Sequence, residues 1–125
     1  MPPSAAQVLI VEDELLAAWH VESILQDLGH VVCGIAAKGE EAVRLAAELA
    51  PDIIFMDVNL GSGLDGIEAA KRIREASPVP VVFVTAYVDA ATRQRITTAV
   101  PDARVLSKPV SPATVRVAIA SQLKA

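Results

Sequence analysis

Four short apolar runs in this sequence each end in a reactive polar residue. The runs begin at Val8, Ile53, Val81 and Val105, and the residues that close them are Glu12 with Asp13, Asp57, Thr85 and Lys108. Runs this short and rich in Val, Ile and Leu are typical of strands buried on both faces, as in a parallel sheet covered by helices. Such sheets bind ligands beyond the carboxyl ends of their strands. We therefore expect three carboxylates, a hydroxyl and an ammonium to meet at one edge of a sheet.

Helix patterns alternate with these strand patterns along the whole chain. Strands are expected at 8–11, 31–36, 53–57, 81–84 and 104–107, and helices at about 14–28, 40–50, 65–76, 90–99 and from 112 onward. Gly29 stands where a left-handed cap is favoured, and Ser111 followed by Pro112 is a typical helix start. The alternation predicts right-handed βαβ units. The expected fold is α/β, with a doubly wound, five-stranded parallel sheet and five helices in a single domain spanning residues 1–125.

Charge and composition argue against several classes of protein. The net charge is −4 and the basic residues are scattered, so we expect no attachment to nucleic acid or to an anionic membrane. The N-terminal segment lacks the pattern of a secretory signal, and no stretch approaches the ~20 apolar residues of a membrane span. The single cysteine, Cys33, excludes an internal disulfide and is expected to be a core thiol. We expect a cytoplasmic protein.

The acids are the most informative residues chemically. Carboxylates crowded together repel each other, and a hard divalent cation such as Mg²⁺, or Mn²⁺ in its place, is the usual relief. With the cation bound, one carboxylate can attack phosphorus and form an acyl phosphate. Lys108 and Thr85 then supply positive charge and a hydrogen bond to the phosphoryl group. Each residue alone has an ordinary structural explanation, so the prediction depends on their joint placement at successive strand ends.

These residues stand in segments that resemble the receiver domain of two-component response regulators, over essentially the whole chain. The matching segments are Val8-Leu9-Ile10-Val11-Glu12-Asp13-Glu14, Ile54-Phe55-Met56-Asp57, Leu64-Asp65-Gly66-Ile67-Glu68-Ala69, Val84-Thr85-Ala86 and Leu106-Ser107-Lys108-Pro109. The resemblance implies a flavodoxin-like fold with strand order 2-1-3-4-5. It also implies a phosphoacceptor signalling function in a two-component system or phosphorelay, with no enzymatic activity beyond phosphorylation and dephosphorylation of its own aspartate.

The resemblance assigns the acceptor and the metal ligands. Asp57 would accept a phosphoryl group from a phosphohistidine on a histidine kinase or histidine phosphotransfer protein. Asp13 and Asp57 would ligate Mg²⁺ together with the backbone carbonyl of Asn59, while Glu12 would act largely through a metal-bound water. Because no further domain follows in this sequence, output is expected through a downstream protein partner, through a homodimer, or by acting as a phosphate sink.

The resemblance also assigns the groups that bind and report the phosphoryl group. Thr85, Ala86 and Lys108 would bind it, and the switch would comprise Thr85, Tyr87, Lys108 and Pro109, acting on the surface of the helix at 90–99 and the strand that follows. The bond between Lys108 and Pro109 would be a cis peptide that aims the lysine. The helix at 90–99 has few apolar anchors and is expected to be the most easily displaced.

Two segments depart from the usual receiver pattern. The loop 59–66 is one residue longer than usual, is rich in glycine and lacks the usual proline. It does not match a nucleotide phosphate loop, because G-x-x-x-x-G-K-[ST] is missing, so a flexible, lengthened turn is expected. Val105 stands where the family usually has an aromatic residue. Tyr87 resembles the signalling aromatic of a subgroup of stand-alone receivers and is expected to take over that role.

The sequence leaves open the role of two residues in the first helix and the choice between three functions. In the first helix, core spacing is found for Ala17, Val21, Ile24 and Leu28. Leu15 and Trp19 lie off this stripe and are expected to pack at the edge of the core, or else to form an apolar docking patch for a kinase helix. The alternatives for function are a phosphohydrolase of the haloacid dehalogenase type and a receiver-like interaction module that no longer needs phosphate.

Overall fold

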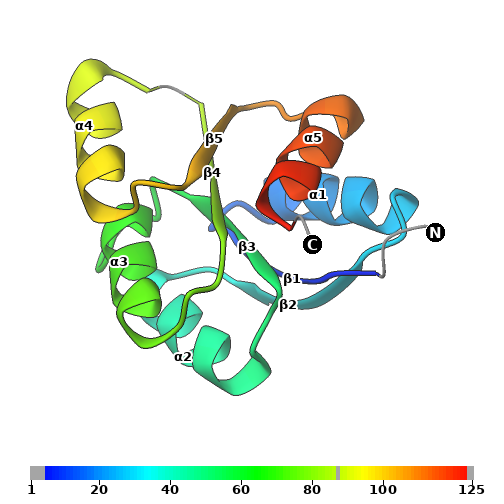
Figure 1. Cartoon of the computed structure of the whole chain (residues 1–125), viewed down its shortest axis with the longest axis horizontal. Coiled ribbons are helices and arrows are strands. Elements are labelled where there is room, and N and C mark those ends of the chain that lie inside the picture. The colour runs from blue at the N-terminus through cyan, green and yellow to red at the C-terminus, as the bar shows by residue number, and fades with distance from the viewer. Residues whose placement is uncertain (1–4, 87, 124–125) are drawn as a thin grey trace.

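The computed structural model describes residues 5–86 and 88–123, which form one sheet and its covering helices. The strands are β1 (Gln7–Val11), β2 (Val31–Ala36), β3 (Ile53–Asp57), β4 (Val81–Thr85) and β5 (Arg104–Ser107). The helices are α1 (Leu15–Asp27), α2 (Gly39–Leu49), α3 (Gly66–Ala76), α4 (Ala90–Ala99) and α5 (Pro112–Gln122). All paired strands are parallel and their order is β2-β1-β3-β4-β5 (Figure 1). The predicted flavodoxin-like α/β fold is confirmed.

Helices α2, α3 and α4 cover one face of the sheet, and α1 and α5 cover the other (Figure 1). The sheet therefore separates two apolar layers. Side chains alternate between the faces of a strand, so Leu9 and Val11 pack under α2, α3 and α4, while Val8 and Ile10 pack under α1 and α5. Phe55 and Phe83, the largest fully buried side chains, lie in opposite layers. Burial on both faces explains why the central strands are continuous apolar runs.

Capping residues set the helix boundaries close to those expected. Gly29 has φ +89° and follows α1, as predicted for a left-handed cap. The Ser111 side chain accepts a hydrogen bond from the Thr114 N–H in a capping box at the start of α5, which confirms the expected helix start. The Asp65 side chain caps α3 by accepting a hydrogen bond from the Glu68 N–H at 2.9 Å.

Helix α4 has the fewest apolar anchors of the helices described. Among its residues only Ile96 is buried. An ion pair between Arg95 and Asp65, 2.7 Å long, ties α4 to the N-terminus of α3. The expectation that α4 is easily displaced stays a prediction, but its composition and its single buried residue agree with it.

Three positions differ from the expected burial. Leu15 and Trp19 are 56% and 51% exposed, so the expectation that they pack at the edge of the core is wrong. Cys33 is only half-buried, and its thiol donates a hydrogen bond to the Val8 carbonyl at 3.4 Å. In the part of the chain described, no helix combines the length and the apolar character needed to cross a bilayer.

Candidate functional site

Three carboxylates meet at the carboxyl ends of β1 and β3, which are neighbours in the sheet. One oxygen from each of Glu12, Asp13 and Asp57 lies within 4.8 Å of the others. Glu12 and Asp57 are buried, whereas Asp13 faces solvent. This cluster confirms that the sequence brings the three acids together at one edge.

Lys108 reaches the same cluster from the loop after β5. Its Nζ donates hydrogen bonds to Glu12 Oε2 at 2.7 Å and to Asp57 Oδ2 at 3.2 Å. Its backbone N–H donates to the Thr85 carbonyl at 2.9 Å, which fixes this loop to the end of β4. The ammonium therefore neutralises part of the negative charge of two buried acids.

The remaining predicted residues that the structure describes lie at or just after the ends of β3, β4 and β5. Thr85 is the last residue of β4 and is fully buried, and Ala86 follows it on the surface. The peptide bond between Lys108 and Pro109 is cis, as expected. The Asn59 N–H donates to Asp57 Oδ1 at 3.1 Å. Tyr87, the expected switch residue, lies outside the residues that the structure describes.

The buried position of Glu12 shifts the pKa of its carboxyl group. Burial, with the charge of Asp57 adding to it, raises the pKa of Glu12 to about 7, although hydrogen bonds from Lys108 and the Glu14 backbone oppose the shift. Burial alone would lower the pKa of Lys108, but its bond to Glu12 and the charges of both acids raise it instead. A divalent cation would relieve this crowding. The potential ligands of this site are all oxygen atoms, which suit Mg²⁺, so the residues present fit that ion.

A groove beside the acids was not expected from the sequence. It runs between α1 and the loop after β5, and Leu16, His20, Lys108 and Pro109 are among its lining residues. Leu16 is 78% exposed. Together with Leu15 and Trp19 it forms an exposed apolar surface on the first turns of α1, which we call the α1 patch. The sequence indicated Leu15 and Trp19, which lie off the core stripe of α1, as one possible apolar patch, and their exposure agrees with that alternative. Leu16 was not singled out, although one helix face cannot bury two adjacent leucines.

Comparison with known proteins identifies the fold and its role. A model of the response regulator receiver domain matches residues 8–120. The chain belongs to this family. Receiver domains are the signalling domains of two-component systems, and five parallel strands in the order found here are their architecture.

Relatives and solved structures agree with this assignment. The chain is 36% identical over 121 residues to the phyllosphere-induced regulator PhyR of Methylorubrum extorquens, covering 95% of this chain and 44% of PhyR. It is 40% identical to the transcriptional regulatory protein PdtaR of Mycobacterium tuberculosis over 65% of this chain and 39% of that protein. The signal receiver domain of a modulated diguanylate cyclase from Desulfovibrio desulfuricans has a TM-score of 0.88 at 39% identity, with 95% of this chain and 94% of that one covered.

The chain spans less than half the length of these two curated relatives. The anti-anti-sigma factor PhyR of Bartonella quintana shows the same relation among solved structures, with a TM-score of 0.78, 31% identity, and coverage of 96% of this chain but 48% of that one. Membership of the receiver family does not favour the phosphohydrolase alternative. The candidate acceptor also lies on β3, and Asn59 stands where the second acid of a haloacid dehalogenase would be.

Proposed function

We propose that this domain relays a signal by accepting a phosphoryl group on Asp57. The observation that supports this most directly is the surrounding of the Asp57 carboxylate. It lies within 4.8 Å of carboxylate oxygens of Glu12 and Asp13, and Lys108 donates to it at 3.2 Å. An acid placed between a cation site and an ammonium can be both a ligand and a nucleophile.

In the proposed transfer, an Asp57 oxygen attacks the phosphorus of a phosphohistidine. A P–O bond forms as the P–N bond breaks, and the electron pair of the P–N bond leaves with the imidazole nitrogen of the donor. The Lys108 ammonium exchanges its bond to Asp57 for one to a phosphoryl oxygen, and the Thr85 hydroxyl and the Ala86 N–H donate to the same group. The energy of the new contacts is then available to shift the loop that leads into α4.

The cation would be held by Asp13, Asp57 and the backbone carbonyl of Asn59, with Glu12 acting through a water molecule. Mg²⁺ is the proposed ion and Mn²⁺ could substitute for it. When bound, it supplies positive charge against the phosphoryl oxygens that approach the acids.

Intact-mass spectrometry after incubation with acetyl phosphate tests the acceptor. We expect one phosphoryl adduct on the wild-type protein in the presence of Mg²⁺ or Mn²⁺, and none with a chelator. Asp57→Asn keeps the shape of the side chain and should lose the adduct, whereas Asp27→Asn, on the exposed end of α1, should keep it. An adduct that persists in Asp57→Asn would place the acceptor elsewhere.

The α1 patch is the proposed docking surface for the phosphodonor, a histidine kinase or a histidine phosphotransfer protein. Leu16 belongs both to the patch and to the groove that Lys108 lines, so a helix bound there would present its phosphohistidine near Asp57. Leu16→Glu should slow transfer from the donor protein about tenfold or more and leave transfer from acetyl phosphate unchanged. Val31→Glu, at an exposed position on β2, is the matched control.

The output surface in this proposal is formed by α4 and β5. Thr85 closes β4 ahead of α4, and Lys108 follows β5, so both phosphoryl-binding side chains are attached to this side of the domain. A downstream protein or a second copy of the chain would bind there. Because histidine kinases take their phosphoryl groups from ATP inside the cell, we place the protein in the cytoplasm.

A further inference from the structure

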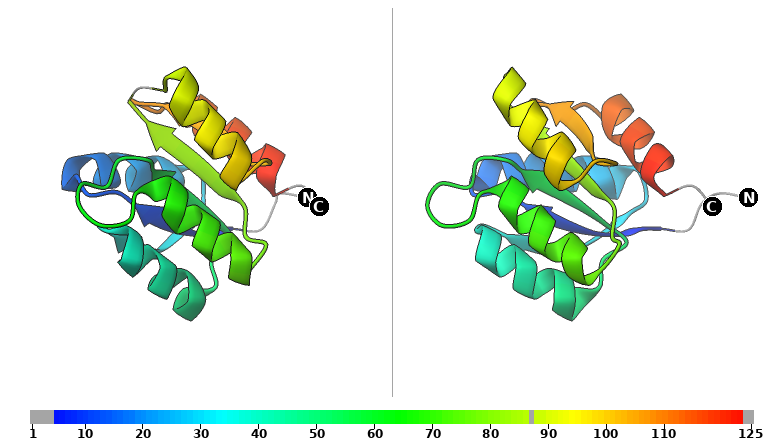
Figure 2. Two further views of the ribbon diagram at one scale, coloured as in Figure 1. Left: turned by 90° about the vertical axis from the view of Figure 1, so that its left-hand side faces the viewer. Right: turned by 60° about the vertical axis from the view of Figure 1, so that its left-hand side comes forward.

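The loop that follows Asp57 is fixed at both ends by its own residues. The Asn59 N–H donates to Asp57 Oδ1 at 3.1 Å, and the Gly66 N–H donates to the Val58 carbonyl at 2.8 Å. Leu60 is buried, with 3% of its surface exposed. The loop projects beyond the ends of the strands, next to the start of α1 (Figure 2, green). None of these contacts involves residues 61–63, in the middle of the loop.

Two glycines give the middle of the loop its shape. Gly61 has φ +75° and Gly63 has φ +83°, a conformation that residues with a side chain rarely adopt. Gly61 lies beside the candidate metal ligand Asp13, since a β-carbon at position 61 would be 3.6 Å from Asp13 Oδ2. Glycine loses more conformational freedom on ordering than other residues, so this segment needs an external contact to stay next to Asp13.

Glu40, in the first turn of α2, makes that contact. Its Oε2 accepts a hydrogen bond from the Leu64 N–H at 3.2 Å. Its carboxylate also packs on the neighbouring glycine, because a β-carbon at Gly63 would lie 2.7 Å from Oε2 and 2.9 Å from Oε1. Gly39 packs equally closely on Leu64, where a β-carbon at position 39 would lie 2.7 Å from the Leu64 carbonyl oxygen.

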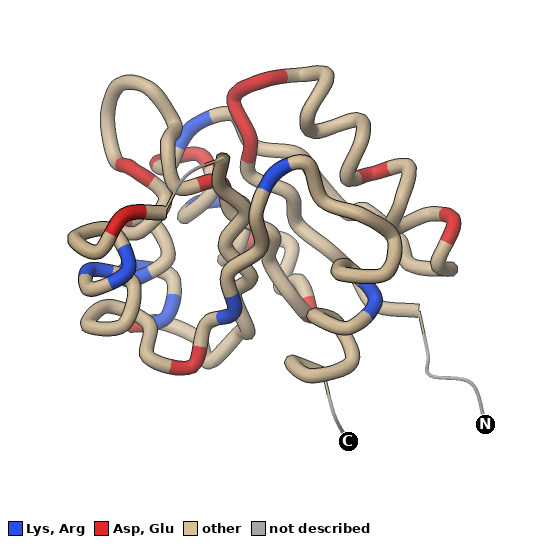
Figure 3. The backbone as a smooth tube through the Cα atoms, turned by 90° about the horizontal axis from the view of Figure 1, so that it is seen from above, with Lys and Arg blue, Asp and Glu red and all other residues tan. Residues whose placement is uncertain are grey.

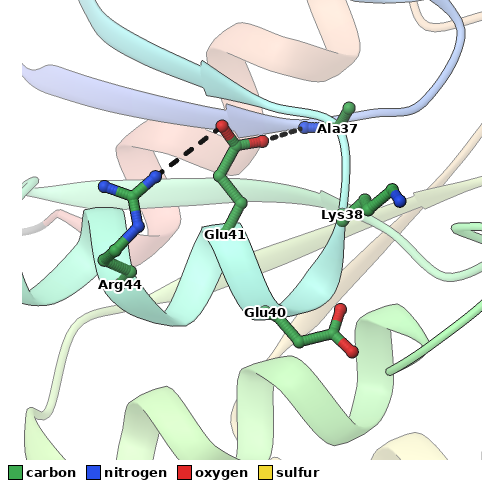
Figure 4. Close-up of a pocket in the computed structure, with 5 residues that line it drawn as sticks. All are labelled: Ala37, Lys38, Glu40, Glu41 and Arg44. Carbon is green, nitrogen blue, oxygen red and sulfur yellow. Dashed lines mark hydrogen bonds and ion pairs between the residues drawn. The ribbon is translucent and has the colours of Figure 1, made fainter.

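The neighbouring acid on the same helix has a different partner. Figure 4 shows Glu41 turned toward Ala37 and Arg44, while Glu40 points away from both. Glu41 accepts from the Ala37 N–H at 2.9 Å and lies 3.9 Å from the Arg44 guanidinium. Glu40 instead faces the loop, and hydrogen bonds from its own backbone N–H and from Leu64 lower its pKa, so its carboxylate is charged at neutral pH.

We propose that Glu40 is a positioning residue for the cation site: it holds the glycine turn 61–63 against Asp13 through the Leu64 N–H. A charged acceptor makes a stronger bond than a neutral one, which suits a contact that must order a flexible turn. With the turn in place, Asp13 is limited to the arrangement that meets Asp57. The proposal rests on the function proposed above, because the cation matters only if Asp57 accepts a phosphoryl group.

Hydrogen exchange of the metal-free protein is the first test. The Leu64 amide should exchange faster in Glu40→Ala than in the wild type, and at an intermediate rate in Glu40→Gln, whose amide oxygen still accepts a hydrogen bond. Glu48→Ala is the matched control, because it removes one negative charge from α2 at a residue that pairs with Arg44 at 3.0 Å. Its Leu64 amide should exchange as in the wild type.

The second test is Mn²⁺ affinity, measured by water proton relaxation. Removing groups that orient metal ligands typically lowers affinity 10–100-fold, and Glu40 acts one step further away, so we expect a loss of about threefold to tenfold in Glu40→Ala. Glu40→Gln should lose clearly less. An equal loss in Glu40→Ala and Glu40→Gln would mean that only the negative charge matters and would overturn the proposal.

The two proposals fail in distinguishable ways. If the exchange rate of Leu64 and the Mn²⁺ affinity of Glu40→Ala equal those of the wild type, the role of Glu40 is refuted, even if Asp57 is phosphorylated. A wild-type protein that gains no phosphoryl adduct would refute the proposed function, whatever the exchange data show. Exchange is measured without cation or phosphodonor, so it reports the tether alone.

Discussion

Lys108 and Glu12 stand 96 positions apart in the sequence, yet the Lys108 Nζ donates a hydrogen bond to Glu12 Oε2 at 2.7 Å. Glu12 directly follows β1 and Lys108 directly follows β5, and these two strands are separated in the sheet by β3 and β4. The bond therefore links the acid cluster to the far edge of the sheet. Basic residues occur on several elements of the backbone (Figure 3), but among the described residues only Lys108 has an ion pair with these acids.

This link predicts a separation between phosphorylation and response in Lys108→Ala. The variant should still gain a phosphoryl group from acetyl phosphate, since the cation carries most of the charge neutralisation. It should lose the conformational response, because no ammonium connects the phosphoryl group to the loop after β5. Amide chemical shifts of α4, recorded with and without acetyl phosphate, measure this. Lys71→Ala, on the exposed face of α3, is the control. If acetyl phosphate changes the α4 shifts of Lys108→Ala as much as those of the wild type, the prediction is contradicted.

The raised pKa of Glu12 predicts how stability depends on pH in the metal-free protein. Below about pH 4.5 both states hold the proton, and the contribution of Glu12 is fully present. As the pH rises toward 7, the unfolded chain releases the proton while the folded chain keeps it, so the free energy of unfolding falls.

Urea unfolding of the wild type and Glu12→Gln between pH 4 and pH 8, with a chelator present, measures this effect. Glutamine does not titrate, so the wild type should lose stability relative to the variant as pH increases, and the difference should level off above about pH 7. Titrating groups that do not interact with Glu12 cancel in the comparison. A difference that is constant over this range would mean that Glu12 is not perturbed by its buried surroundings.

Asp65 predicts a cost to stability when the cap of α3 is removed. Its side chain accepts the Glu68 N–H at 2.9 Å and pairs with Arg95 at 2.7 Å. Asp65→Ala should lower the free energy of unfolding by about 1–2 kcal/mol, as for other N-caps. Asp65→Asn keeps an acceptor and should cost less, and Arg95→Ala should cost no more than about 1 kcal/mol because that pair is partly exposed. An Asp65→Ala protein as stable as the wild type would contradict the capping role.

The same residue has a pH dependence of opposite sign to that of Glu12. Burial would raise the pKa of Asp65, but the Glu68 N–H and Arg95 outweigh it and hold the pKa below the ordinary 3.8. Its contribution is therefore present above about pH 4 and is lost as the pH falls through the lowered value. Acid unfolding of Asp65→Asn, compared with the wild type, should show a smaller loss of stability below pH 4.

The fold could be predicted because its strands have a clear sequence pattern. Runs such as Val8–Val11 are buried on both faces, and the polar residue after each run marks the end of the strand. In α1, by contrast, the fully buried residues are Ala18 and Leu25, while Ala17 and Leu28, which have equally good spacing, are half-buried. The buried face of α1 is set by its packing against the sheet and α5. The helical period alone does not identify that face.

The candidate site also combines features that the sequence predicts with features that it does not. The acids and Lys108 were predictable because strand ends meet at one edge of a parallel sheet. The bond from Leu64 to Glu40 was not, because it joins a loop to another helix 24 positions away and depends on backbone directions. No residue type or spacing in the sequence marks such a contact.

Gly66 gives the sharpest prediction about the acceptor loop. A β-carbon at this position would overlap the backbone carbonyl of Asp57 and come within 3.0 Å of the Val58 Cα. Backbone atoms cannot move aside as a flexible side chain does, so Gly66→Ala must displace the acceptor strand or the start of α3. We expect a loss of about 1–3 kcal/mol in the free energy of unfolding, as for other overpacked sites.

Gly29→Ala is the matched control, since a β-carbon there meets no atom within 4 Å and the cost arises only from φ +89°. That left-handed conformation costs a non-glycine residue roughly 1–2 kcal/mol. The two variants should therefore lose similar stability but differ in function. Gly66→Ala should also slow phosphorylation by acetyl phosphate, because the Asp57 backbone is moved, whereas Gly29→Ala should be phosphorylated at the wild-type rate. Equal rates in the two variants would show that the close contact between Gly66 and Asp57 does not position the acceptor.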